Sequence, residues 1–207
     1  MPELDTDYAA AGFNGALPFG KSPALIIIDV VMAYIDPASP LYLGPVNALP
    51  ELHRLRAAAK AAGVPVLFTN IAYAPGGLEG GMFYRKVPAL KAFHAGSPLG
   101  AFPLELQPEE GDHVVSKFYP SAFFGTALAP MLHAMGVDTV LLTGYSTSGC
   151  VRASALDALC HGFAPYVISD ACADRDTRPH EGNLFDMQAK MAEVIDTDRA
   201  IQLLGGV

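Results

Sequence analysis

The stretch Ala24-Leu25-Ile26-Ile27-Ile28-Asp29-Val30-Val31 decides the fold of this chain. Its first five residues are apolar, three of them isoleucine, and they run directly into a carboxylate at Asp29. Unbroken apolarity over so short a run is typical of a strand that is covered on both faces, as strands in parallel sheets are. The sequence therefore predicts a buried parallel strand that ends at Asp29.

Similar runs alternate with helical segments along the rest of the chain. Further strands are predicted at Val64–Ile71, His113–Lys117, Thr139–Gly144 and Ala164–Asp170, with a weaker edge strand at Glu193–Asp196. Helical spacing of apolar residues predicts helices over Val46–Ala62, Thr126–Met135, Cys150–His161 and Pro179–Met191. This alternation indicates the α/β class, as a three-layer α/β/α sandwich around a central, mostly parallel sheet of about six strands. The stretches Asp36–Pro45 and Ala72–Gly81 are expected to be loops over one rim.

Length and composition favour a single domain over residues 1–207, with residues 1–18 as an N-terminal arm. The 207 residues are 51% hydrophobic and 16% charged, which allows a sizeable core. Met1–Asn14 lacks the basic and apolar regions of a secretory signal, and no apolar run is long enough to span a bilayer. We therefore expect a cytoplasmic protein that does not contact a membrane.

Charge and cysteine content narrow the classes of function. A formal net charge of −8 without any Lys/Arg run disfavours nucleic-acid binding, which needs a basic face. The three cysteines, Cys150, Cys160 and Cys172, are expected to be free thiols. No Cys or His pair shows the close spacing of a zinc site, so a zinc site is not indicated. No cofactor is expected.

Ligands of open parallel sheets bind beyond the carboxyl ends of the strands. The residues at those ends are Asp29, Asn70, Lys117 and the turn Gly144–Cys150. An isolated buried ammonium is costly, so Asp29 is a candidate partner for Lys117 on a neighbouring strand end. Taken alone, Asp29 is also consistent with a helix cap or a salt-bridge partner, and Lys117 with a solvated lysine at a strand end.

Cys150 follows a turn that leads from a predicted buried strand into a predicted helix. The helix dipole favours a thiolate at such a position, and successive backbone N–H groups of the turn can hold an oxyanion. The alternative is a small buried apolar side chain, the usual role of a free cysteine. Cys160 and Cys172 fit that second role better.

Three motifs together resemble the isochorismatase-like cysteine hydrolases. They are Asp29 after its aliphatic strand, Lys117 in KFYPSAFFGT (117–126), and Gly-x-x-x-x-Gly-Cys-Val-Arg at 144–152. The resemblance extends from Phe19 to about Leu204. It is closer to the branch of maleamate amidohydrolases and N-carbamoylsarcosine amidases, through PASPLY (37–42), YRKVP (84–88) and PHEGNLFD (179–186).

The resemblance implies roles for these residues. Cys150 would be the nucleophile, Asp29 would take the thiol proton, and Lys117 would hold both in place. A cis, non-proline peptide at Tyr145–Ser146 is implied, with the amides of Ser146 and Cys150 as the oxyanion hole. Metal-dependent nicotinamidases of the superfamily carry an Asp-x-His motif where this chain has Asn70-Ile71-Ala72, so no catalytic metal is expected.

The expected reaction is hydrolysis of a small carboxylic acid amide, with maleamate favoured as a step in nicotinate degradation. A ureido acid such as N-carbamoylsarcosine is the alternative, and a non-catalytic binding module is a third. Family resemblance also implies a homo-oligomer, either a tetramer or a dimer.

The substrate carboxylate needs cationic or fork-shaped donors. Candidates are Arg85 and Lys86 in the loop after the second strand and Arg175 after the fifth, although each is also explained as a surface charge, and Arg175 as a structural ion pair. Thr147 and Tyr119 are candidates for neutral hydrogen bonds. Further candidates for the pocket lining are Phe83, Phe118, Phe123 and His180.

Overall fold

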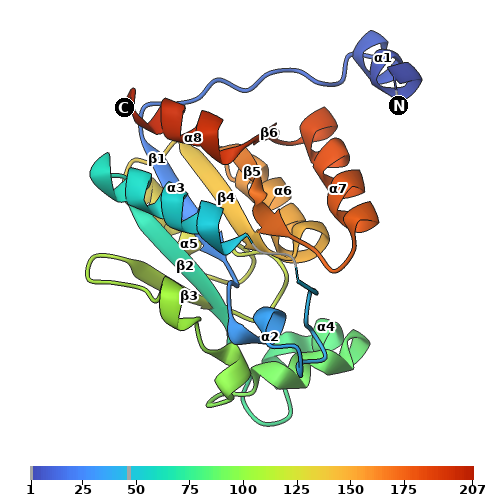
Figure 1. Cartoon of the computed structure of the whole chain (residues 1–207), viewed down its shortest axis with the longest axis vertical. Helices are drawn as coiled ribbons and strands as arrows, with labels where there is room; N and C mark the ends of the chain where they lie inside the picture. Colours follow the sequence, from blue (N-terminus) through green and yellow to red (C-terminus); the bar gives the residue numbers. More distant parts are fainter. Residues whose placement is uncertain (1, 46–47) are drawn as a thin grey trace.

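Within residues 2–45 and 48–207, which the computed structural model describes, six strands form one parallel sheet (Figure 1). The strand order is β3-β2-β1-β4-β5-β6, and every neighbouring pair is parallel. The bounds are β1 Pro23–Ile28, β2 Val66–Ile71, β3 His113–Lys117, β4 Thr139–Tyr145, β5 Ala164–Ala173 and β6 Glu193–Ile195. The predicted α/β sandwich with a mostly parallel sheet is confirmed.

The strand β1 lies in the middle of the sheet, between β2 and β4, and all six of its residues are buried. Its side chains alternate between two cores. Leu25 and Ile27 pack into one core, whereas Ala24, Ile26 and Ile28 pack into the other. The unbroken apolar run thus reflects burial on both faces.

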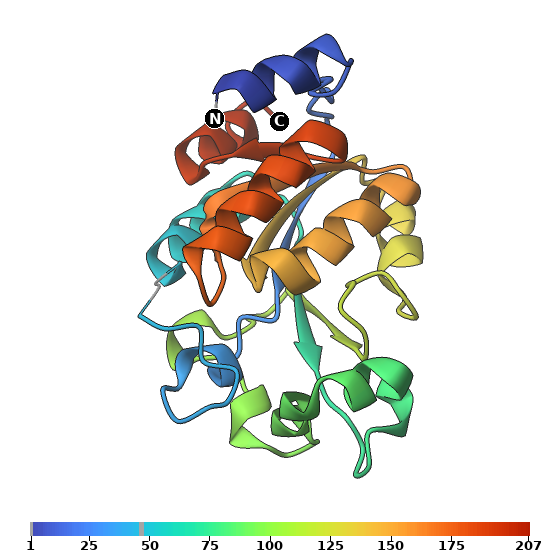
Figure 2. The same cartoon turned by 90° about the vertical axis from the view of Figure 1, so that its right-hand side faces the viewer.

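Helices cover both faces of the sheet (Figures 1 and 2). Helices α3 and α8 contribute Leu52, Leu55 and Leu204 to one core, and α5, α6 and α7 contribute Leu132, Ala155 and Met187 to the other. The bounds are α1 Pro2–Ala10, α2 Met32–Ile35, α3 Leu49–Ala61, α4 Gly81–Lys86, α5 Leu128–Ala134, α6 Arg152–Cys160, α7 Thr177–Lys190 and α8 Thr197–Leu204.

Several element boundaries differ from those predicted. Of the helix predicted over Val46–Ala62, Val46 and Asn47 lie outside the described residues, and the described helix begins at Leu49. Strand β2 begins two residues late, and α5 is shorter than the predicted Thr126–Met135. Helix α7 begins two residues early, because the Asp176 side chain caps it by accepting from the Arg178 N–H.

The segment between β2 and β3 is more structured than the sequence predicts. It contains α4 and short 3₁₀ turns at Leu78–Gly80, Pro88–Phe93, Pro98–Gly100 and Leu104–Leu106. Arg85 and Lys86, expected in a loop, lie in the last turn of α4. Figure 2 shows this green segment lying beyond the carboxyl end of β2, where the site was expected.

The N-terminal arm lies at the opposite end of the molecule (Figure 2). Its helix α1 packs against α7 through the rings of Tyr8 and Phe185, 5.3 Å apart. Farther along the arm, the backbone N–H of Asn14 donates to the Ala189 carbonyl at 3.0 Å. In the described ranges no helix has the length and apolarity needed to cross a membrane.

Candidate active site

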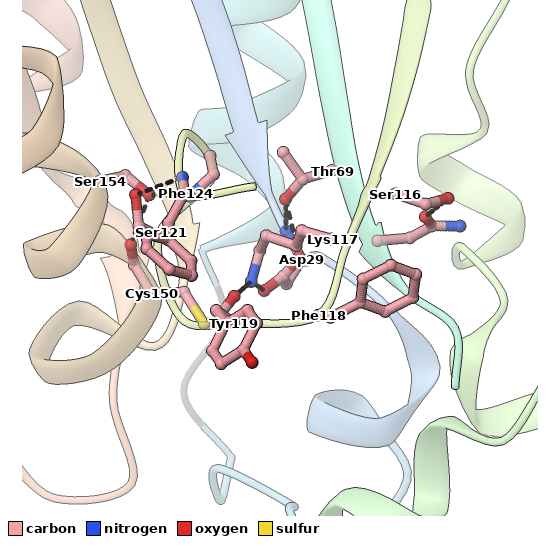
Figure 3. A network of polar contacts seen from close by, with 12 residues as sticks. Asp29, Thr69, Ser116, Lys117, Phe118, Tyr119, Ser121, Phe124, Cys150 and Ser154 are labelled. Atoms are coloured by element: carbon pink, nitrogen blue, oxygen red, sulfur yellow. Dashed lines mark hydrogen bonds and ion pairs between the residues drawn. The ribbon is translucent and has the colours of Figure 1, made fainter. Parts of the chain in front are cut away.

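A carboxylate, an ammonium and a thiol meet at the carboxyl ends of the strands (Figure 3). Lys117 Nζ lies 2.7 Å from Asp29 Oδ2 and 3.4 Å from Cys150 Sγ. Asp29 and Lys117 are fully buried, and Cys150 is 5% exposed. The fold thus brings together the three residues that the strand ends indicated.

Asp29 is held by β2. Its backbone amide donates to the Thr69 carbonyl at 3.2 Å, and the Thr69 hydroxyl donates to Asp29 Oδ1 at 2.7 Å. Asp29 has φ of 50°, an uncommon conformation that Asp tolerates better than most residues. The side chain of Thr69 was not singled out from the sequence, where it follows three apolar residues of β2 and precedes Asn70.

Lys117 reaches Asp29 across an intervening strand. The two residues were expected on neighbouring strand ends, but β2 lies between β1 and β3. Neighbouring strands are about 4.8 Å apart, and the long lysine side chain spans the end of β2 to its partner. Lys117 Nζ also donates to the Tyr119 carbonyl at 3.0 Å. Desolvation lowers the pKa of Lys117, but the interactions with Asp29 and with the Cys150 sulfur outweigh it, so the net pKa is raised and the ammonium form is favoured.

Cys150 lies inside a π-helical turn, Thr147–Val151, rather than at the start of the predicted helix. The peptide Tyr145–Ser146 before it is cis. Burial raises the pKa of the thiol to about 12; Lys117 lowers it and Asp29 raises it, and burial dominates. Burial therefore favours the protonated thiol and opposes the effect expected from a helix N-terminus, which favours the thiolate.

Gly144 allows β4 to approach β1 next to this cluster. Its φ is +103°, and a Cβ built there would lie 2.1 Å from the carbonyl oxygen of Ile28. Only glycine fits that conformation and that contact. The residue before Asp29 is therefore positioned by a glycine at the end of the neighbouring strand.

A cavity of about 580 Å³ opens onto the thiol. Among its described lining residues Arg175 is the one positively charged side chain, and most of the rest are apolar. The lining comprises Tyr34, Pro40, Leu41, Leu43, Phe83, Val87, Ala89, Leu90, Pro120, Ser146, Gly149, Cys150, Asp174, Arg175, Asp176 and Pro179. Both residues proposed for the oxyanion hole, Ser146 and Cys150, line this cavity.

The predicted substrate-binding cations lie in different places. Arg175 lines the cavity, and its Nη2 donates to the Pro40 carbonyl at 2.7 Å. A structural ion pair was the other role considered for Arg175. Within the described part of the chain its side chain makes no ion pair. Arg85 and Lys86 are exposed on α4 and do not line the cavity.

The other residues predicted to line the site also differ in whether they reach the cavity. Phe83 lines the cavity, whereas Phe123 is buried in a core and Phe118 packs near Tyr73. Thr147 is fully buried, with its hydroxyl 2.8 Å from His180 Nδ1. The Tyr119 ring contacts Phe124. Asn70, at the end of β2, does not line the cavity, and its side chain accepts from the Ser116 hydroxyl. Cys160, on α6, was expected to be buried but is exposed.

Asp174 was not assigned a role from the sequence, but it supports the turn that carries Cys150. Its Oδ2 accepts from the Ser148 N–H at 2.7 Å, and its Oδ1 accepts from the Arg175 N–H at 2.8 Å. No pattern in the sequence distinguishes it from the neighbouring Asp176. Among the described residues no three His, Cys, Asp or Glu side chains are grouped so that they could hold a metal ion.

The chain is similar to known proteins over most of its length. Residues 23–199 match the isochorismatase domain. A maleamate amidohydrolase of Pseudomonas putida is 47% identical over 188 residues, covering 90% of this chain and 88% of that protein. An N-carbamoylsarcosine amidase of Arthrobacter is 32% identical over 203 residues, covering 95% of this chain and 76% of that protein.

A solved structure shares the fold. A cysteine hydrolase from Pseudomonas syringae superimposes with a TM-score of 0.87 at 23% identity. The match covers 92% of this chain and 96% of that one.

Proposed function

The chain belongs to the isochorismatase family and is an amidohydrolase that acts on amide C–N bonds, and we propose that it hydrolyses maleamate to maleate and ammonia with Cys150, Asp29 and Lys117. One observation carries the proposal: the buried Lys117–Asp29 ion pair contacts the thiol of Cys150 at the surface of a cavity that contains Arg175. The similarity to a maleamate amidohydrolase supports the choice of substrate. The reaction would be a late step of nicotinate degradation.

The first half of the reaction is attack of the Cys150 sulfur on the amide carbon. The raised pKa of the thiol opposes loss of its proton to solvent. Transfer of that proton to Asp29 leaves the net charge of the three buried groups unchanged, so burial opposes it far less. Lys117 stabilises the developing thiolate, and the amides of Ser146 and Cys150 are suited to the oxyanion.

The second half releases both products. Asp29 returns its proton to the departing nitrogen, ammonia leaves, and a thioester joins the acyl group to Cys150. Water then adds to the thioester carbon, Asp29 takes a proton from it, and the sulfur leaves to recover the proton as a thiol. One water is consumed in each cycle, and no oxidant or metal is required by this sequence of steps.

Arg175 is the candidate for binding the substrate carboxylate. A guanidinium presents parallel donors that match a carboxylate, and the backbone carbonyl of Pro40 holds one of its nitrogens. Arg85 and Lys86 are weaker candidates because they lie outside the cavity. Tyr119 and Thr147 are weaker as neutral donors, since neither lines it.

Hydrolysis of a ureido acid is the second candidate function. The 32% identity to an N-carbamoylsarcosine amidase over 95% of the chain favours it next. The same three residues would serve either substrate, and the shape of the cavity around Arg175 decides between them. A non-catalytic binding role accounts less well for a buried ion pair in contact with a thiol. Independence of metals, cytoplasmic location and assembly as a homo-oligomer stay predictions of this proposal.

The test is ammonia release from maleamate, N-carbamoylsarcosine and nicotinamide. We expect wild type and Cys160→Ser, at an exposed cysteine on α6, to turn over maleamate and Cys150→Ala to be inactive. Turnover of the ureido substrate alone would keep the mechanism and replace the substrate. Activity that survives in Cys150→Ala would overturn the mechanism.

A further inference from the structure

Two side chains tie the turn Thr147–Val151 to the segment that follows β5. His180 Nδ1, on α7, lies 2.8 Å from the Thr147 hydroxyl. Asp174 Oδ2 accepts from the Ser148 amide at 2.7 Å. Both partners come from residues 174–180, the segment that also carries Arg175 to the cavity. The turn that carries the nucleophile is therefore anchored next to the residue proposed to bind the substrate.

The Thr147 hydroxyl has His180 as its hydrogen-bond partner. Thr147 is fully buried and does not line the cavity, so its hydroxyl is directed into the protein. A buried hydroxyl left without a hydrogen-bond partner is destabilising. His180 is the partner that the structure provides. Burial lowers the pKa of His180, and the nearby charges of Asp174 and Glu181 oppose that shift.

The position of this turn matters for catalysis. Thr147 directly follows Ser146 and lies three residues before Cys150, the two residues whose amides are proposed for the oxyanion hole. Donors for an oxyanion must lie within a few tenths of an ångström of the correct distance. A displacement of about 1 Å in a catalytic group costs about a hundredfold in rate.

From this geometry we infer that His180 is a positioning residue: by holding Thr147, it keeps the Ser146 and Cys150 amides aligned on the reacting carbonyl. The inference rests on the proposed function. His180 contacts neither the thiol nor the cavity, so its effect is on the chemical step rather than on substrate binding. Loss of the contact therefore lowers kcat and leaves KM nearly unchanged.

Four variants test it with maleamate, or with N-carbamoylsarcosine if that is the substrate of the wild type. His180→Ala and Thr147→Val each remove the contact, and we expect kcat to fall about tenfold to a hundredfold with KM within about threefold. The double variant should be no worse than either single one, because both lose the same contact. His180→Asn keeps a polar group near the position of Nδ1 and should recover most of kcat.

The control is His53→Ala, at an exposed histidine on α3, and it should leave kcat unchanged. Equal kcat in His180→Ala and wild type would overturn the inference. So would losses that multiply in the double variant, or a rise in KM without a fall in kcat. If His180→Ala fails to fold, the comparison of His180→Asn and Thr147→Val decides. Cys150→Ala separates this result from the proposed function: an inactive Cys150→Ala with an unaffected His180→Ala rejects the positioning role alone.

Discussion

At the scale of single residues, the Asp29–Lys117 pair is an expensive arrangement. Moving two charges out of water costs several kcal/mol per ion, and their attraction offsets this only when the remaining polar atoms are satisfied. Here Thr69 donates to Asp29 and Lys117 donates to the Tyr119 carbonyl. By this reasoning the pair adds little net stability, and the proposed proton transfer at Cys150 gives a reason for its presence.

Replacing Lys117 with methionine tests this view. Lys117→Met leaves the Asp29 carboxylate buried without its cation, so we expect the free energy of unfolding to fall by about 3–5 kcal/mol and amide hydrolysis to be lost. Urea denaturation and an ammonia assay measure the two effects. Asp29→Asn/Lys117→Met should recover part of the stability but no activity. Lys86→Met, at an exposed lysine, is the control; stability of Lys117→Met equal to that of the control would contradict the prediction.

Replacing Arg175 separates binding from chemistry. A hydrogen bond to a charged group contributes about 1.5–3 kcal/mol, so Arg175→Met should raise KM for maleamate about tenfold to a hundredfold, with a smaller effect on kcat. Arg175→Lys keeps the charge but loses the paired donors of the guanidinium, so its KM should lie between those of wild type and Arg175→Met. Steady-state kinetics provide the measurement. Arg85→Met and Lys86→Met should have wild-type KM; a larger effect in either would move the carboxylate site to α4.

At the scale of elements, the approach of β4 to β1 positions the site. Gly144→Ala would force a Cβ against the Ile28 carbonyl at a positive φ, and we expect a loss of about 3 kcal/mol or more in unfolding free energy together with lost activity. Gly162 is a matched control, because its φ is +87° and no neighbouring atom of the described residues lies within 4 Å of where its Cβ would be. Gly162→Ala should cost only about 1–2 kcal/mol. Thermal unfolding compares the two, and equal losses would show that the close contact is unimportant.

At the scale of the whole molecule, a buried thiol and a buried phenol make the free energy of unfolding depend on pH in the alkaline range. Burial raises the pKa of Cys150 from 9.0 to about 12 and that of Tyr145 from 10.0 to about 12. Well below pH 9 both groups are protonated in the folded and unfolded states alike. Between about pH 9 and 12 the unfolded chain releases protons that the folded chain keeps, so the free energy of unfolding falls as pH rises.

Urea denaturation at a series of pH values tests this consequence. The unfolding free energy should decline from about pH 9 upward, by at most about 1.4 kcal/mol per pH unit for each such group. Tyr145→Phe removes one group and should make the decline shallower above pH 10. A flat profile from pH 8 to pH 11, or a Tyr145→Phe profile as steep as that of wild type, would show that these groups titrate normally in the folded state.

The sequence by itself determined the sheet and the residues at its rim. The unbroken apolar runs at β1 and β4 predicted buried parallel strands because burial on both faces leaves no polar side of a strand. The polar residue that closes each run marks the carboxyl end, which is why Asp29, Lys117 and the turn to Cys150 were predicted on one edge. Hydrophobic patterning and strand ends are local properties, and they can be read along the chain.

Only the tertiary structure decided how distant side chains meet. Strand order puts β2 between Asp29 and Lys117, and no local pattern encodes that order. Arg85 and Arg175 are equivalent in the sequence, yet only Arg175 lines the cavity, because the direction of a side chain depends on how α4 and the segment after β5 pack. The burial that keeps Cys150 a thiol and the contact between Thr147 and His180 arise from several elements converging. Such convergence is a property of the folded molecule, since it joins residues that are far apart along the chain.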